Sequence, residues 1–68
     1  MTKTEAADII GTDVLVWSRQ TGAPITRSLV EARMWEMGGG HLGGRKKEAV
    51  DTGVSGRTVL VYAKRNAL

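Results

Sequence analysis

Two stretches of nearly identical pattern decide the expected fold: "GTDVLVWSR" at residues 11–19 and "GRTVLVYAK" at residues 56–64. Each runs from a glycine to Val-Leu-Val, an aromatic residue, a small residue and a basic residue. Apolar and β-branched side chains at consecutive positions are typical of a strand that is buried on both faces. At a period of two, the valines of each copy would share one face, and the leucine and the aromatic residue the other. We therefore predict two core strands of one sheet.

A short helix is expected before the first of these strands. Thr2 and Glu5 have capping-box spacing, and Gly11 is suited to end the helix in a left-handed conformation. A helix that ends in glycine, with Ala7 and Gly11 suitably placed, is also compatible with the first half of a helix-turn-helix. The apolar run that follows argues against this interpretation, because a second helix of that motif offers polar side chains to DNA.

The rest of the chain completes a mostly β fold. Turn residues predict a bend at "QTGAP", residues 20–24, and a hairpin whose turn cluster, residues 51–56, lies between residues 49–50 and 58–59. Residues 25–37 sort into two faces as a strand, although Ser28 and Glu31 again have capping-box spacing. We expect a four-stranded antiparallel meander or small open barrel with a short N-terminal helix. The alternative is an α+β fold in which residues 28–37 are helical.

Size and composition set further expectations. The 68 residues predict a single small domain, residues 1–68, which buries little core by itself. The chain has no cysteine and one histidine, so a disulfide framework, a metal site and any cofactor are not expected. It lacks an apolar run of membrane-spanning length, and its first residues do not resemble a signal peptide. These features predict a soluble cytoplasmic protein without a membrane partner.

Residues 37–48, "MGGGHLGGRKKE", invite comparison with catalytic and phosphate-binding loops. A Walker-type loop needs Lys-Ser/Thr after its last glycine, whereas Arg45 follows Gly44 here. The stretch "GVSG" is one residue short of a nucleophile elbow, so serine hydrolysis is not expected either. We interpret residues 38–46 as a flexible, glycine-rich basic loop, and the protein as a non-enzyme.

Charge is the main functional signal. Residues 1–36 carry four Lys/Arg and five Asp/Glu, whereas residues 37–68 carry six and two, a net charge of +4. Such an asymmetry favours an anionic partner, because Lys and Arg displace counterions from phosphates. We predict a small non-enzymatic protein that contacts nucleic-acid phosphates. The candidate contact residues are Arg45, Lys46, Lys47, Arg57, Lys64, Arg65, Arg19 and His41.

The large aromatic residues support a second hypothesis. Trp17, Trp35 and Tyr62 are candidates for base stacking or for a protein interface. The alternative function is therefore a protein-interaction module or inhibitor, of the kind that phages and plasmids encode. It would dock on an acidic or nucleic-acid-binding surface of a larger protein complex. Because apolar residues would lie on both sheet faces, we also expect a homodimer when the protein is free, with Trp17 or Trp35 in the contact.

Overall fold

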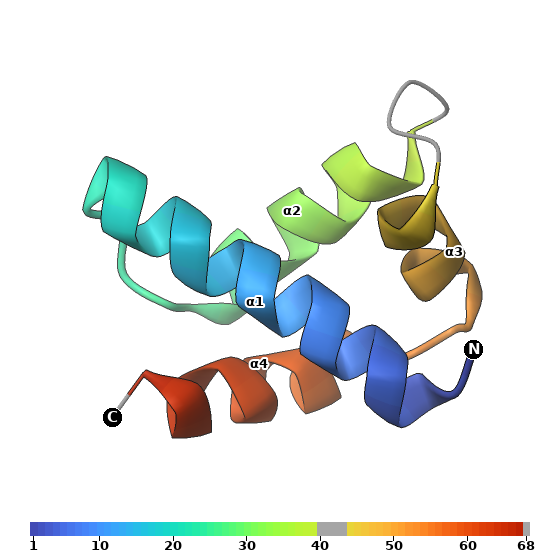
Figure 1. The fold of residues 1–68 in the computed structure, drawn as a ribbon. Helices are drawn as coiled ribbons and strands as arrows, with labels where there is room; N and C mark the ends of the chain where they lie inside the picture. The colour runs from blue at the N-terminus through green and yellow to red at the C-terminus, as the bar shows by residue number, and fades with distance from the viewer. Residues whose placement is uncertain (40–43, 68) are drawn as a thin grey trace.

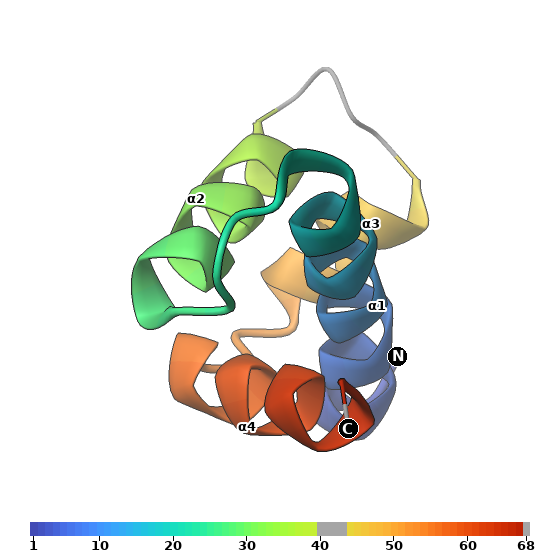
Figure 2. The same ribbon diagram turned by 90° about the vertical axis from the view of Figure 1, so that its left-hand side faces the viewer.

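A computed structural model describes residues 1–39 and 44–67, and all regular secondary structure in these residues is helical. The helices are α1 (Lys3–Thr21), α2 (Arg27–Gly38), α3 (Arg45–Asp51) and α4 (Gly56–Asn66). The long α1 contacts the three other helices, and α3 and α4 each pack on both α1 and α2. Figures 1 and 2 show α1 crossing α4. In Figure 1, α4 lies below α1, and α3 lies at the right of the bundle. Among the described residues the backbones of α3 and α4 do not pack on each other.

The predicted mostly β fold is wrong, both as an antiparallel meander and as a small open barrel, because no strand occurs in the described residues. The turn of the predicted hairpin, residues 51–56, is instead the end of α3, a connection at residues 52–55 and the start of α4. The alternative α+β fold was right about residues 28–37, which lie in α2, but wrong about the sheet. The cap of α2 is Thr26, whose side chain accepts a hydrogen bond from the Leu29 amide, rather than the expected Ser28.

Burial explains why the repeated stretch is helical. Val14 and Val59 are fully buried, whereas Val16 and Val61 are 47% and 45% exposed. A strand would place both valines of a copy on one face, but residues two apart on a helix point in nearly opposite directions. Both copies of the repeat are therefore helical and bury the equivalent face, and their apolar period is 3.6 residues rather than two.

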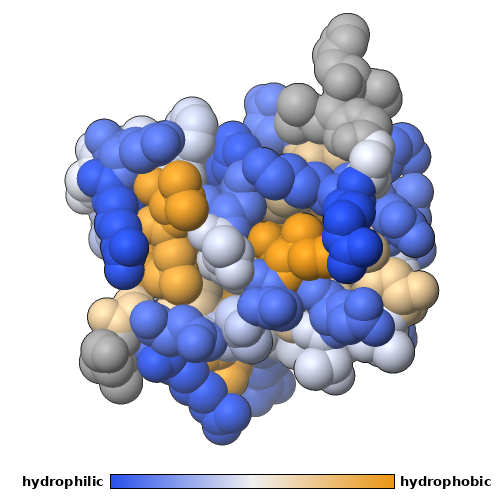
Figure 3. Space-filling view, viewed as in Figure 1, coloured by the Kyte–Doolittle hydropathy of each residue, from blue (hydrophilic) through white to orange (hydrophobic). Residues whose placement is uncertain are grey.

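The core lies where the four helices meet, and it is built from small and medium-sized side chains. Its buried members are Ala6, Ala7, Ile10, Val14, Val30, Met37, Ala49, Val54, Val59 and Ala63. On the face that α1 presents, hydrophobic side chains form separate patches divided by hydrophilic ones (Figure 3).

Local signals place the ends of α1. The predicted capping box of Thr2 and Glu5 is present, and the Thr2 hydroxyl accepts from the Glu5 amide at 3.1 Å. Gly22 caps the other end with φ of 74°, as expected for a turn at residues 20–24. Gly11 was expected to end the helix, but it is a buried residue in the middle of α1. There the ring of Tyr62 in α4 packs against it.

Gly11→Ala tests this close approach of α1 and α4. A Cβ at residue 11 would lie 2.5 Å from Cδ1 of Tyr62, closer than real contacts allow. Alanine favours a helix by about 1 kcal/mol, but overpacking costs about 1–3 kcal/mol. We expect Gly11→Ala to destabilise the protein by about 1 kcal/mol, and to stabilise a Tyr62→Ala background by a similar amount. Urea unfolding of the four proteins measures both effects, and the same sign in both backgrounds would contradict the contact.

Candidate nucleic-acid interface

A four-residue turn, residues 52–55, joins α3 to α4 and fixes where α4 begins. Gly53 adopts φ of 79°, a left-handed conformation that glycine accepts without strain. The Thr52 hydroxyl donates to the Ala49 carbonyl at 2.7 Å and accepts from the Val54 amide at 3.3 Å. Val54 itself is buried in the core. A short helix, a four-residue turn with glycine and a second helix follow each other here in the order of a helix-turn-helix, although α3 and α4 do not pack on each other in the described residues.

The second helix of this unit, α4, starts from a well-defined cap. The Ser55 side chain accepts from the Thr58 amide at 3.1 Å, and the two hydroxyls lie 2.9 Å apart. Val59 and Ala63 bury one face of α4 in the core. The first turn of α4 also lies close to α2, since a Cβ on Gly56 would approach the Arg27 guanidinium. The orientation of α4 is therefore fixed from its cap and from its buried face.

The opposite face of α4 is exposed and basic. At 3.6 residues per turn its members fall within about one third of the helix circumference. This α4 outer face consists of Arg57, Thr58, Val61, Lys64 and Arg65, all exposed. Helix α4 contains no Asp or Glu. It therefore presents three cations without an acidic residue between them.

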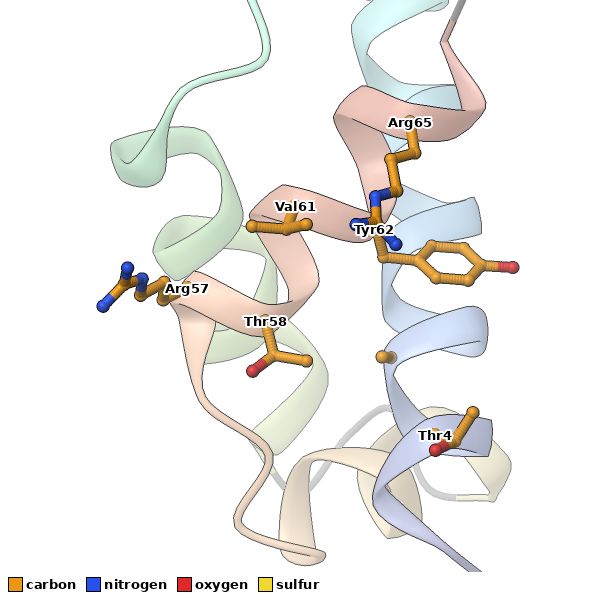
Figure 4. A pocket seen from close by; sticks show the side chains of 7 residues that line it. Thr4, Arg57, Thr58, Val61, Tyr62 and Arg65 are labelled. Atoms are coloured by element: carbon orange, nitrogen blue, oxygen red, sulfur yellow. The ribbon is translucent and has the colours of Figure 1, made fainter.

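A shallow groove of about 320 Å³ runs between the α4 outer face and the first turns of α1. Its lining residues are Thr4, Ala7, Arg57, Thr58, Val61, Tyr62 and Arg65. Figure 4 shows Tyr62 directed toward α1, and Arg57 and Val61 on the side of α4 away from α1. Arg65 follows Arg57 by eight positions, which is about 12 Å along a helix axis.

Ion pairs elsewhere leave the charge of the α4 outer face available. Within residues 1–39 and 44–67, four salt bridges form, and Arg57, Lys64 and Arg65 take part in none of them. The pairs are Arg27–Glu31, Arg33–Asp13, Lys46–Asp13 and Lys47–Asp51. The cations of α4 can therefore meet an external anion without first breaking an internal ion pair.

Tyr62 and Asp8 hold the side of α4 that faces α1. The Tyr62 hydroxyl donates a hydrogen bond to the Asp8 carboxylate. This bond raises the pKa of Tyr62, since the phenolate could not donate it and would be repelled by the carboxylate. The Tyr62 ring also packs on Gly11, so both ends of the side chain contact α1. We therefore assign Tyr62 to positioning α4 rather than to the exposed surface.

A cluster of charged side chains joins α1, α2 and α3. Asp13 of α1 accepts hydrogen bonds from Arg33 of α2 at 2.8 and 3.3 Å, and from Lys46 of α3 at 3.1 Å. The Asp13 side chain is only 8% exposed. The Arg33 guanidinium also lies 4.3 Å from the centre of the Trp17 ring, a cation–π contact. This Asp13 cluster holds α2 and α3 against α1. It thereby stabilises the arrangement of helices that positions α4.

The Asp13 cluster predicts a specific acid sensitivity. Burial raises the pKa of Asp13, but the hydrogen bonds and charges of Arg33 and Lys46 outweigh it and lower the pKa below the ordinary value of 3.8. Because the folded pKa lies below the unfolded one, the ionised carboxylate stabilises the fold above about pH 4. This stabilisation is lost as the pH falls through the folded pKa. We expect the Tm difference between wild type and Asp13→Asn to be constant near neutrality and to shrink below about pH 4. A difference unchanged down to pH 2 would contradict the assignment.

The structure brings some predicted site residues together and separates others. Arg57, Lys64 and Arg65 share the α4 outer face. Arg45, Lys46 and Lys47 start α3 rather than belonging to a loop, and Lys46 and Lys47 are held in salt bridges. Arg19 is exposed in the last turn of α1. His41 and the other residues from 40 to 43 lie outside the described residues.

The three aromatic residues have different surroundings. Trp17 is partly covered by Arg33, and Tyr62 contacts Asp8 and Gly11. Trp35 is 83% exposed on α2. The prediction that Trp17 and Tyr62 lie on equivalent faces of two strands is wrong, because there is no sheet in the described residues.

Sequence reasoning missed the helix-turn-helix unit and the roles of Thr58, Val61 and Asp13. One signal was available: Ala49 and Gly53 have the same four-residue spacing as Ala7 and Gly11, the pair that was considered for this motif. Gly53 is followed by the apolar Val54 and by the capping residue Ser55, which suits the start of a second helix. No comparable signal marked Asp13, whose partners lie 20 and 33 residues away in the sequence.

Comparisons with protein-family models, with curated proteins and with solved structures find no match for this chain. Within the described residues, no group of three or more His, Asp or Glu side chains is arranged to hold a metal ion. None of the helices in that part of the chain combines the length and the apolar character needed to cross a membrane.

Proposed function

We propose that this protein is a cytoplasmic, non-enzymatic DNA-binding protein, and that α4 enters the major groove of a duplex. The observation that carries the proposal is the α4 outer face. It combines Arg57, Lys64 and Arg65 on one exposed helical surface that has no acidic residue. The second helix of a helix-turn-helix is the element that reads the major groove.

The dimensions of α4 favour duplex DNA over other nucleic acids. Its 11 residues extend about 16 Å, and the major groove of B-DNA, about 12 Å wide, admits a helix. The major groove of A-form RNA is too narrow for side chains to read. Binding to single strands requires exposed aromatic side chains, and the α4 outer face has none.

Salt-dependent binding tests the proposal. If Lys64 and Arg65 each neutralise one phosphate, the log-log slope of affinity against salt should be about −2. Fluorescence anisotropy of a labelled duplex measures it, with a single strand of the same length as the control. We expect tighter binding to the duplex. Absence of duplex binding at low salt, or a preference for the single strand, would contradict the proposal.

One observation favours a second candidate function, which is protein interaction through α2. Trp35 is 83% exposed, and hollows beside it are lined by Met34, Gly38, Gly39 and Val50. Tryptophan is among the residues that most often dominate binding energy at protein interfaces. The partner would be a larger protein or a second copy in a homodimer. Sedimentation of wild type and Trp35→Ala at micromolar concentration tests the dimer: a mass near 7.3 kDa for both proteins would contradict it.

A further inference from the structure

The α4 outer face is divided along its length, and this division suggests how DNA sequence is read. Arg57 and Val61 lie in the first two turns, whereas Lys64 and Arg65 lie in the last turn. We infer that Arg57 contacts a guanine, that Val61 contacts the methyl group of a thymine about two base pairs away, and that Lys64 and Arg65 contact phosphates. This inference rests on the proposed function, because it names the DNA sequence that the same face would select.

Arg57 has the position and freedom that base reading needs. It is the second residue of α4 and is exposed, whereas Gly56 before it packs against Arg27 and Glu31 of α2. In the described part of the chain it forms no salt bridge, and Figure 4 shows it extending away from α1. Residues near the N-terminus of a recognition helix contact base edges, and a guanidinium pairs in a bidentate manner with O6 and N7 of guanine.

Val61 is an exposed apolar residue on a cationic surface. Its side chain is 45% exposed, although the residues beside it on the face are Arg57, Lys64 and Arg65. An apolar side chain in the major groove can contact the thymine methyl group, which cytosine lacks. Val61 follows Arg57 by one helical turn, about 6 Å, and base pairs are spaced about 3.4 Å apart. The spacing therefore corresponds to about two base pairs.

The remaining polar side chain in this half of α4 is already engaged. The Thr58 hydroxyl lies 2.9 Å from the Ser55 hydroxyl, and the Thr58 amide donates to the same Ser55 oxygen. Turning the hydroxyl toward a base would break its hydrogen bond with the Ser55 hydroxyl. We therefore assign sequence reading to Arg57 and Val61, and not to Thr58.

Selection from a random duplex library identifies the preferred sequence. Wild type, Arg57→Gln, Val61→Ala and Lys64→Gln are used in parallel, and circular dichroism melting checks that each variant folds. We expect wild type to enrich a guanine with a thymine about two positions away. Arg57→Gln should lose the guanine preference, and Val61→Ala the thymine preference. Lys64→Gln should bind all sequences more weakly without changing either preference.

Base analogues then test the two contacts atom by atom in the selected duplex. Replacing the guanine by 7-deazaguanine removes N7, and replacing the thymine by deoxyuridine removes the methyl group. The first change should weaken wild-type binding by about 5- to 150-fold and leave Arg57→Gln unaffected. The second should weaken wild type more than Val61→Ala.

The outcomes separate this inference from the proposed function. Duplex binding without base preference, or an unchanged preference in Arg57→Gln and Val61→Ala, overturns the base contacts and leaves the proposed function standing. Absence of duplex binding by wild type overturns both.

Discussion

Replacing Arg57 and Arg65 by glutamine should weaken duplex DNA binding by about 100-fold at constant salt. The two arginines stand at the ends of the α4 outer face, and neither is held by an internal salt bridge in the described residues. Their loss removes a base contact and a phosphate contact together. Both side chains are exposed, so the Tm should change little.

A matched control separates the position of the charge from its amount. Arg19 and Arg45 are also exposed and form no salt bridge within the described residues, but they lie on α1 and α3. Arg19→Gln with Arg45→Gln lowers the formal net charge from +3 to +1, as the double α4 variant does. We expect only a severalfold loss of affinity for this control. Equal losses in the two double variants would mean that overall charge, and not α4, governs binding.

Asp13→Ala should be among the most destabilising single substitutions in the chain. Removing this carboxylate leaves Arg33, whose side chain is only 15% exposed, without its partner, and breaks the link from α1 to both α2 and α3. Breaking a fully buried pair costs about 3–5 kcal/mol, and the partial exposure here lowers the expected cost to about 2–3 kcal/mol. In a domain of this size that corresponds to a fall in Tm of about 10–20 °C.

Asp51→Ala is the control for this prediction. Asp51 also forms a salt bridge, with Lys47 at 3.1 Å, but its side chain is 60% exposed and its partner is one turn away on the same helix. Such pairs contribute about 0.3–0.5 kcal/mol. Thermal melts of both variants measure the contrast. A Tm for Asp13→Ala within a few degrees of Asp51→Ala would contradict the role of the Asp13 cluster.

The sequence contained enough local information to place the start of α1, but not its end or the period of the apolar segments. The Thr2 capping box depends on neighbouring residues and was predicted correctly, whereas the helix expected to end at Gly11 continues to Thr21. In contrast, the apolar run Val-Leu-Val is compatible with both a strand and a helix. The packing of the four helices decides between the two, because it leaves Val16 and Val61 exposed while it buries Val14 and Val59.

The candidate interface could be predicted in composition but not in arrangement. The basic second half of the chain pointed to Arg57, Lys64 and Arg65. However, the same reasoning grouped them with Lys46, which forms a salt bridge with Asp13 in the folded protein. Long-range ion pairs cannot be read from sequence spacing, because they depend on which helices become neighbours.

An NMR titration of the labelled protein with a short DNA duplex tests whether α4 is the element that binds DNA. We expect the amide shifts to concentrate on α4, on the turn at residues 52–55 and on the first turns of α1 that line the groove. Trp35 and its neighbours on α2 should remain unchanged. Shifts centred on Trp35, or spread evenly over the basic residues of α1 and α3, would show that α4 is not the DNA-binding element.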